Sequence, residues 1–150
     1  MRADPSLPPY ALVVVDTNVL LSAALVRSGT AALLVDRLLA HGKLVVSEVT
    51  FAEMESRIWK PKFDRYLSME TRRTILRELN ASAFWVDVPD PITQQHHSRD
   101  PNDDAFIHAA KAAGVTRLVS GDDDLLCLDP LGELRILSPR DALGELGAGS

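Results

Sequence analysis

The sequence predicts an α/β protein with one domain, built on a central parallel β-sheet of about five strands with helices on both faces. Three observations support this class: 150 residues suffice for one ordinary domain, short apolar runs alternate with segments of helical period, and no repeat or linker divides the chain. Strands that alternate with helices imply crossover connections, which build parallel sheets covered on both faces. We expect the domain at residues 11–146, an N-terminal extension at residues 1–10 and a flexible tail at residues 147–150.

In the first half of the chain, two short apolar runs predict strands buried on both faces, at residues 12–15 and 44–46. Apolar residues at helical spacing predict helices at residues 19–25, 31–40 and 48 to about 59. His41 and Gly42 end the second of these helices, and Ser47 is the expected N-cap of the third.

The second half repeats the alternation after Pro61. Ser68 is the expected N-cap of a helix at residues 69–83, and a helix that starts at the Asp-Pro-Asn-Asp block of residues 100–103 runs to residue 113. Three further strands are expected, at residues 84–88, 116–119 and 134–137. Residues 89–99 are expected to form a loop, and a short helix follows the last strand.

Composition excludes several classes of protein. A hydrophobic fraction of 46% and a mean hydropathy near zero are typical of a globular chain, not a disordered or fibrous one. A single cysteine, Cys127, excludes an internal disulfide and a cysteine-rich zinc site. We expect neither a membrane span nor a secretory signal, and therefore a cytoplasmic location. The net charge of −5, taken alone, argues against a nucleic-acid partner.

The positions of the acidic residues point to one shared cleft. Asp16 directly follows the first expected strand, and three consecutive aspartates, residues 122–124, follow the fourth. In open parallel sheets, ligand sites form outside the carboxyl ends of the strands, near the point where the strand order reverses. Further acidic residues are expected near the same edge, at Glu53, Asp100, Asp103 and Asp104.

Several carboxylates in one cleft repel one another and raise their pKa values unless a cation neutralises them. Hard oxygen ligands without cysteine suit Mg²⁺ or Mn²⁺. Such ions typically activate water and bind the phosphodiester during in-line displacement. The sequence therefore predicts metal-assisted hydrolysis of phosphodiester bonds.

Simpler interpretations of the same acids exist. Asp100 and Asp103 are explained by helix capping and the helix dipole, worth about 1 kcal/mol each, whereas Asp104 gains less from capping and is favoured as functional. Glu53 is compatible with a surface ion pair to Arg57, worth only about 0.3 kcal/mol. An Asx turn at Asp16 is disfavoured by its position at the end of an apolar strand.

Four segments, in this order, resemble the motifs of the PIN-domain nucleases. They are residues 14–20 (VVDTNVL), 47–53 (SEVTFAE), 104–110 (DAFIHAA) and 120–126 (SGDDDLL). The resemblance covers about residues 12–142. The aspartate-rich block at 100–104 and the late segment at 136–139 are similar to the VapC-like branch, the toxin components of toxin–antitoxin systems.

The resemblance implies a PIN-like fold with a group of catalytic acids, Asp16, Glu53, Asp104 and Asp122. The implied ligands of one or two Mg²⁺ or Mn²⁺ ions are these four residues and Asp124. The residues that would orient the ligands by hydrogen bonds are Thr17, Asn18 and Ser120. The surplus of aspartates leaves open the choices between Asp103 and Asp104 and between Asp122 and Asp124.

By the same resemblance, the protein is expected to hydrolyse single-stranded RNA with metal-activated water, to form a homodimer and to bind a cognate antitoxin. Two alternatives are a non-catalytic RNA- or protein-binding module with the same fold and a housekeeping RNA-processing nuclease. A haloacid dehalogenase requires Asp-x-Asp after the first strand, where residues 16–18 read Asp-Thr-Asn. A response-regulator receiver fits poorly because its phosphoacceptor aspartate ends the third strand.

A basic segment at residues 57–77 carries seven Lys and Arg against two acids, with aromatic residues between them. Such a segment suits a single nucleic-acid strand, through charge and base stacking. The candidates for substrate binding are Arg57, Lys60, Lys62 and Arg65. The alternative is a solvated helix pair with Trp59 and Phe63 as core anchors, and a surface position is the favoured interpretation of His96 and His97.

The acidic motifs also change what the net charge implies. They hold eight of the 21 acidic residues, and the other 13 are outnumbered by the 16 Lys and Arg. A cleft neutralised by cations would therefore lie in a mildly basic surrounding. The negative total charge does not exclude RNA, whose binding should then depend on metal as well as on salt.

Overall fold

Five parallel strands form one sheet in the order β3-β2-β1-β4-β5, as the predicted fold class requires. The strands are β1 (Leu12–Val15), β2 (Lys43–Val46), β3 (Phe84–Trp85), β4 (Arg117–Val119) and β5 (Arg135–Leu137). This computed structural model describes residues 6–148. The expectations for residues 1–5 of the extension and 149–150 of the tail lie outside the described residues.

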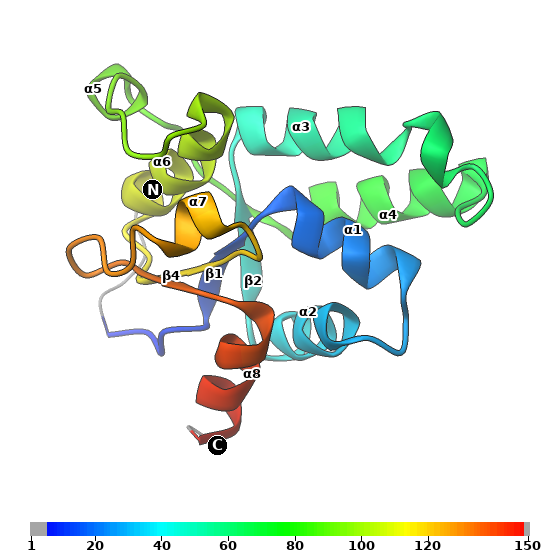
Figure 1. Cartoon of the computed structure of the whole chain (residues 1–150), viewed down its shortest axis with the longest axis horizontal. Coiled ribbons are helices and arrows are strands. Elements are labelled where there is room, and N and C mark those ends of the chain that lie inside the picture. Colours follow the sequence, from blue (N-terminus) through cyan, green and yellow to red (C-terminus); the bar gives the residue numbers. More distant parts are fainter. Residues whose placement is uncertain (1–5, 149–150) are drawn as a thin grey trace.

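Helices surround this sheet (Figure 1). The longer ones are α1 (Thr17–Leu25), α2 (Thr30–His41), α3 (Glu48–Ile58), α4 (Met69–Ser82), α6 (Asp104–Ala113) and α8 (Pro139–Ala148). The shorter ones are α5 (Asp90–Thr93), α7 (Asp123–Leu126) and the 3₁₀ turns η1 (Pro61–Phe63) and η2 (Pro101–Asp103). In the described residues no single helix is long and apolar enough to cross a membrane; α1 and α2 together would be, by length and composition only, across a bend of 107°.

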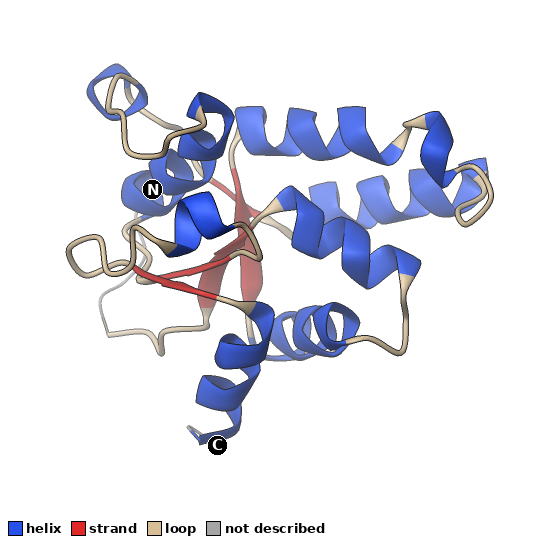
Figure 2. Cartoon of the chain, in the orientation of Figure 1, coloured by secondary structure: helices blue, strands red, loops and turns tan. Residues whose placement is uncertain are grey.

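Figure 2 shows helices on both sides of the sheet, and the alternation of side chains along β1 divides the core into two layers. Val13 and Val15 pack into the layer formed with α1, α2, α3, α4 and α8, whereas Leu12 and Val14 pack into the layer formed with α6 and α7. Successive residues of a strand point to opposite faces, so a strand buried on both sides must be apolar throughout. This explains why the short run at residues 12–15 could be recognised as a central strand.

The strand order reverses beside β1. The chain runs outward from β1 through β2 to β3, and then returns to the other side of β1 for β4 and β5. The carboxyl ends of β1 and β4 are therefore neighbours, joined by a hydrogen bond from the Asp16 N–H to the Val119 carbonyl at 3.0 Å. This is the position at which an open parallel sheet forms its ligand sites.

Besides shifts of one or two residues at the ends of other elements, four differences from the sequence predictions affect the region around the sheet edge and the tail. β3 contains only residues 84–85, because its last ladder bond is made by the Val86 N–H and Pro89 soon follows without a donor. The expected loop at residues 89–99 contains the short helix α5. The helix expected from residue 100 begins as the turn η2, so that α6 itself starts at Asp104. Finally, α8 includes residues 147–148 of the expected tail.

Candidate metal centre

Asp16 links the ends of two neighbouring strands. As the N-cap of α1 it accepts a hydrogen bond at Oδ1 from the Val19 N–H at 2.9 Å, and at Oδ2 it accepts one from the Ser120 hydroxyl beyond β4. Asp16 is 4% exposed, and the adjacent Thr17 is equally buried. Burial raises the pKa of the Asp16 carboxyl group, and the hydrogen bond from Ser120 opposes this shift.

Ser120 also orients the acidic turn that follows β4. Its fully buried Oγ accepts a hydrogen bond from the Asp122 N–H at 3.0 Å. Asp122 is in turn the N-cap of α7, and its Oδ1 accepts a hydrogen bond from the Asp124 N–H at 2.9 Å. One hydroxyl therefore connects the carboxylate of Asp16 with the backbone of this turn.

Asp103 approaches the same turn from the end of η2. Asp103 occupies the N-cap position of α6, but its side chain makes no capping hydrogen bond, so this part of the capping interpretation is wrong. Its Oδ2 is buried and accepts no hydrogen bond from a donor among the described residues, whereas a protonated Asp103 would share its proton with the Asp122 carboxylate. Burial raises the pKa of Asp103 to about 7, and the negative charge of Asp122 contributes in the same direction.

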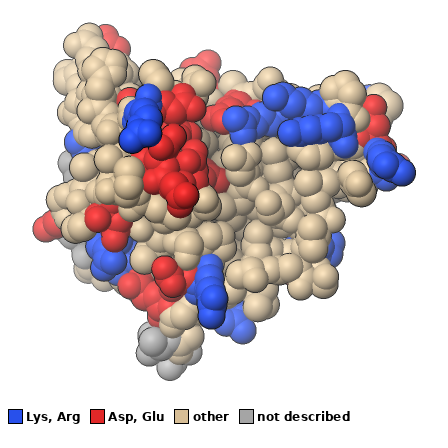
Figure 3. All heavy atoms as spheres, viewed as in Figure 1, with Lys and Arg blue, Asp and Glu red and all other residues tan. Residues whose placement is uncertain are grey.

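Asp103, Asp122 and Asp124 form a compact acidic group, each with one carboxylate oxygen within 4.8 Å of those of the other two. Figure 3 shows a large acidic patch on the surface in the region of α7 and the start of α6. A donor set made only of carboxylate oxygens fits a hard divalent cation such as Mg²⁺ or Mn²⁺. Such an ion would also satisfy the unpartnered Oδ2 of Asp103. The group thus includes two of the expected ligands, together with Asp103.

Glu53 lies near this group on α3, beside Arg57. The Arg57 Nε lies 3.3 Å from the Glu53 Oε1, and its Nη1 donates a hydrogen bond to the Asn18 Oδ1 at 2.6 Å. Burial raises the pKa of Glu53. The positive charge of Arg57 lowers this pKa and the negative charge of Asp16 raises it, so the carboxylates of Glu53 and Asp16 repel each other. The amide of Asn18 is therefore bonded to Arg57, whereas the hydrogen bonds to Asp16 come from Ser120 and Val19.

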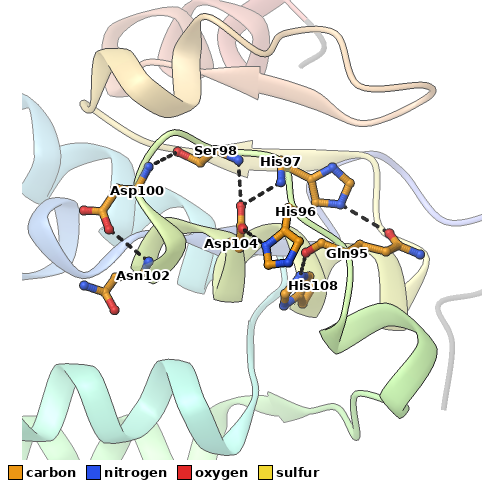
Figure 4. Close-up of polar contacts among 8 residues, drawn as sticks. All are labelled: Gln95, His96, His97, Ser98, Asp100, Asn102, Asp104 and His108. Carbon is orange, nitrogen blue, oxygen red and sulfur yellow. Dashed lines mark hydrogen bonds and ion pairs between the residues drawn. The ribbon is translucent and has the colours of Figure 1, made fainter.

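Asp104 has different contacts from its neighbour Asp103 (Figure 4). It is 3% exposed, and its Oδ1 accepts hydrogen bonds from the backbone N–H groups of His97 at 3.2 Å and Ser98 at 2.7 Å. Its Oδ2 lies 4.0 Å from the Nδ1 of His96. Asp104 therefore anchors the loop before η2, while Asp103 joins the acidic group.

The histidines of this loop lie outside the acidic group. The His96 side chain is 87% exposed, as expected for a surface residue. The His97 ring lies 3.2 Å from the Gln95 Oε1, and the His108 ring nitrogen lies 2.8 Å from the Gln95 carbonyl (Figure 4). Burial lowers the pKa of His97. These contacts tie the loop to α6.

A row of Lys and Arg follows α3 and the segment after it, beside the acidic patch (Figure 3). Of the substrate-binding candidates, Lys60, Lys62 and Arg65 are exposed and Arg57 is half-buried. Arg72 does not belong to this surface: it is 3% exposed, paired with Asp64 at 2.9 Å and stacked over the Trp59 ring. Trp59 and Phe63 pack against the core, whereas Tyr66 is 66% exposed.

Residues 12–124 match the sequence profile of the PIN domain, a range that contains every acidic residue described above. An uncharacterized protein of Methanocaldococcus jannaschii is 32% identical over 118 residues, which cover 77% of this chain and 74% of that protein.

Solved structures share the fold at lower identity. VapBC2 from Rickettsia felis, bound to a DNA fragment from their promoter, is 13% identical, with a TM-score of 0.57 over 85% of this chain and 98% of that one. VapC20 of Mycobacterium tuberculosis, a Sarcin-Ricin loop cleaving toxin, is also 13% identical, with a TM-score of 0.54 over 82% of this chain and 98% of that one. At these identities the likeness is one of fold.

The raised pKa of Asp103 gives a testable pH dependence of stability. The folded state holds the Asp103 proton up to about pH 7, whereas the unfolded chain loses it near pH 3.9, so this residue makes the free energy of unfolding fall as the pH rises between these values. We expect Asp103→Asn to remove that fall. Relative to wild type, the variant should therefore gain stability from about pH 5 to about pH 8, measured by urea denaturation in EDTA.

The comparison between the two proteins is needed because the lowered pKa of His97 acts in the opposite direction, with stability lost as the pH falls. His97 is present in both proteins, so its effect cancels in the difference. Parallel pH profiles for wild type and Asp103→Asn would contradict the assignment of Asp103 to the half-buried acidic group.

Proposed function

Because this chain belongs to the PIN domain family, we propose that it is a metal-dependent endoribonuclease that hydrolyses phosphodiester bonds of single-stranded RNA. The observation that carries the proposal is the acidic group at the reversal of strand order, with the buried, unpartnered Oδ2 of Asp103 beside Asp122. Ionised carboxylates that lie close together repel one another. A divalent cation bound between them would remove this repulsion, so the group is suited to a metal site.

The donors fit one or two Mg²⁺ or Mn²⁺ ions, held by Asp103, Asp122 and Asp124, with Asp16 and Glu53 beside them. When bound, the metal would supply a water activated for attack on phosphorus and positive charge for the phosphate oxygens. The chain itself fixes the geometry. The Ser120 hydroxyl holds Asp16 and the Asp122 turn in register, and Arg57 limits the repulsion between Glu53 and its acidic neighbours.

The basic segment supports a single strand as substrate. Lys60, Lys62 and Arg65 are exposed, and Figure 3 shows Lys and Arg over α3 beside the acidic patch. These side chains would contact phosphates of the bound strand, and the exposed ring of Tyr66 is available for stacking. Arg57 would act closer to the reaction, since it already lies between Glu53 and Asn18.

We further propose that the protein is the toxin of a toxin–antitoxin pair and acts as a homodimer. The fold likeness to VapBC2 and VapC20 supports this role. Expression of the wild-type chain alone should arrest growth, and co-expression of the product of a small adjacent reading frame should restore it. The matched control is Asp16→Asn, which should leave growth unaffected at the same expression level. Arrest by both proteins, or by neither, would favour a housekeeping RNA-processing role.

Cleavage of a single-stranded oligoribonucleotide by the purified protein tests the catalytic proposal. We expect cleavage with Mn²⁺ or Mg²⁺, none after EDTA, and a loss of at least about a hundredfold in kcat/KM for Asp16→Asn and for Asp103→Asn, because each removes a charge at the metal site. Binding of RNA without cleavage under any divalent ion would instead support the non-catalytic module.

The neighbouring Asp104 is the matched variant for Asp103. Asp104→Asn keeps an acceptor for the His97 and Ser98 N–H groups, so we expect a smaller loss of activity than for Asp103→Asn, with a measurable loss of stability. Calorimetric titration with Mn²⁺ separates the two roles: Asp103→Asn should weaken metal binding, and Asp104→Asn should leave it close to wild type. The reverse order would make Asp104 the ligand.

The contribution of the basic segment is measurable as a salt dependence. The double variant Lys60→Gln/Lys62→Gln should reduce the slope of log affinity for RNA against log salt by about 1.4, since each contact to a single strand contributes about 0.7. The control, Arg37→Gln/Lys43→Gln, removes the same charge from exposed positions on α2 and at the opposite end of β2. Equal slopes for the two double variants would contradict a phosphate-binding role for the segment.

A further inference from the structure

A pocket of about 280 Å³ adjoins the acidic group, between α1, the start of α2 and the start of α8. It is lined by Asn18, Val19, Ser22, Ala31, Gly121, Asp122 and Pro139. Asp122 belongs both to this lining and to the acidic group, so an occupant of the pocket would lie next to the reacting centre. Figure 3 shows an uncharged surface over α1 and α2 beside the acidic patch.

The chemistry of the lining is unsuited to the phosphate group of an RNA strand and suited to a base. None of the seven lining residues is Lys or Arg, and the carboxylate of Asp122 would repel a phosphate. Val19, Ala31 and Pro139 offer apolar contact, while Asn18 and Ser22 offer hydrogen bonds. A small number of polar groups on an apolar wall is the usual arrangement for an uncharged heterocycle.

The orientation of Asn18 adds a specific donor. Its Oδ1 accepts the hydrogen bond from Arg57 at 2.6 Å, which assigns the amide NH₂ group to the opposite side of the side chain. The NH₂ group and the Ser22 hydroxyl can thus both donate to the carbonyl oxygens or ring nitrogens that edge a base. Asn18 joins the pocket to Arg57, the residue expected closest to the scissile phosphate.

We propose that this pocket binds one nucleobase of the substrate strand, immediately beside the phosphodiester bond that is cleaved. The inference rests on the proposed function and adds a determinant of where the strand is cut. The basic segment holds the strand by its phosphates, which are the same in every sequence, whereas this pocket contacts a base edge, which is not.

Two substitutions fill the pocket from different walls. A Cβ at Gly121 would meet no atom within 4 Å, and this glycine does not have a positive φ, so Gly121→Leu introduces a side chain without strain in the backbone. Ser22→Leu fills the pocket from α1, at an exposed position away from the acidic turn. Gly144→Leu is the control, because Gly144 has equally open space on α8 and does not line the pocket.

The substrates are single-stranded oligoribonucleotides in which one nucleotide at a time, on either side of the cleaved bond, is abasic. For wild type and Gly144→Leu we expect kcat/KM to fall about tenfold at one position, the order of magnitude for losing one bound base. Both pocket-filling variants should cut intact RNA about tenfold more slowly and lose their sensitivity to the abasic position. Affinities measured by fluorescence anisotropy, in the Asp16→Asn background, should follow the same pattern without cleavage.

The outcomes separate this proposal from the proposed function. If wild type cuts RNA with equal efficiency at every abasic position, or if both filled variants keep the full abasic effect, the pocket does not bind a base, although the nuclease assignment stands. If both filled variants slow abasic and intact RNA equally, they act on the acidic group and the proposal also fails. If the protein never cuts RNA, the nuclease assignment fails and the anisotropy pattern alone decides about the pocket.

Discussion

The carboxylate of Asp16 is the constraint on which the rest of the site depends. It is used twice, as the N-cap that starts α1 and as the acceptor of the Ser120 hydroxyl from the neighbouring strand β4. The same hydroxyl accepts a hydrogen bond from the backbone of Asp122, so the two carboxyl ends at the reversal of strand order are fixed relative to each other. Loss of the whole Asp16 side chain would therefore disturb a helix start, a strand contact and a ligand group together, whereas an asparagine keeps an acceptor for the Val19 N–H.

This arrangement makes the site unfavourable for the folded protein without a cation. Burial raises the pKa values of Asp16, Glu53 and Asp103, which means that folding without a cation costs free energy at neutral pH. Arg57 offsets part of this cost, because its positive charge lowers the pKa values of both Glu53 and Asp16. A divalent ion that binds the folded state alone would recover it, since such binding stabilises the folded state by mass action. Stability and metal affinity are thus two consequences of the same buried charge.

Much of the architecture could be predicted because the signal is local. The strand at residues 12–15 is apolar on both faces, and Asp16 ends it at the edge where parallel sheets bind ligands. The choice between Asp103 and Asp104 could not be made in this way. Consecutive residues near a helix start point about 100° apart, and which of them meets Asp122 depends on the turn η2 and on the loop that Asp104 holds. The burial of Arg72 likewise depends on Asp64 and Trp59, which no local pattern reveals.

The net charge of −5 is distributed unevenly over the surface. The largest acidic patch lies beside a row of Lys and Arg over α3 (Figure 3). A phosphate backbone is attracted by Lys60 and its neighbours and repelled by Asp122 and Asp124 until cations neutralise that group. The pocket that Asp122 shares with this group would hold a base through its uncharged residues, such as Asn18 and Ser22, and needs no such neutralisation. Metal binding would therefore control the entry of the scissile phosphate. The base would be held by the uncharged residues of the pocket and the more distant phosphates by the basic segment, and the metal changes the charge of neither.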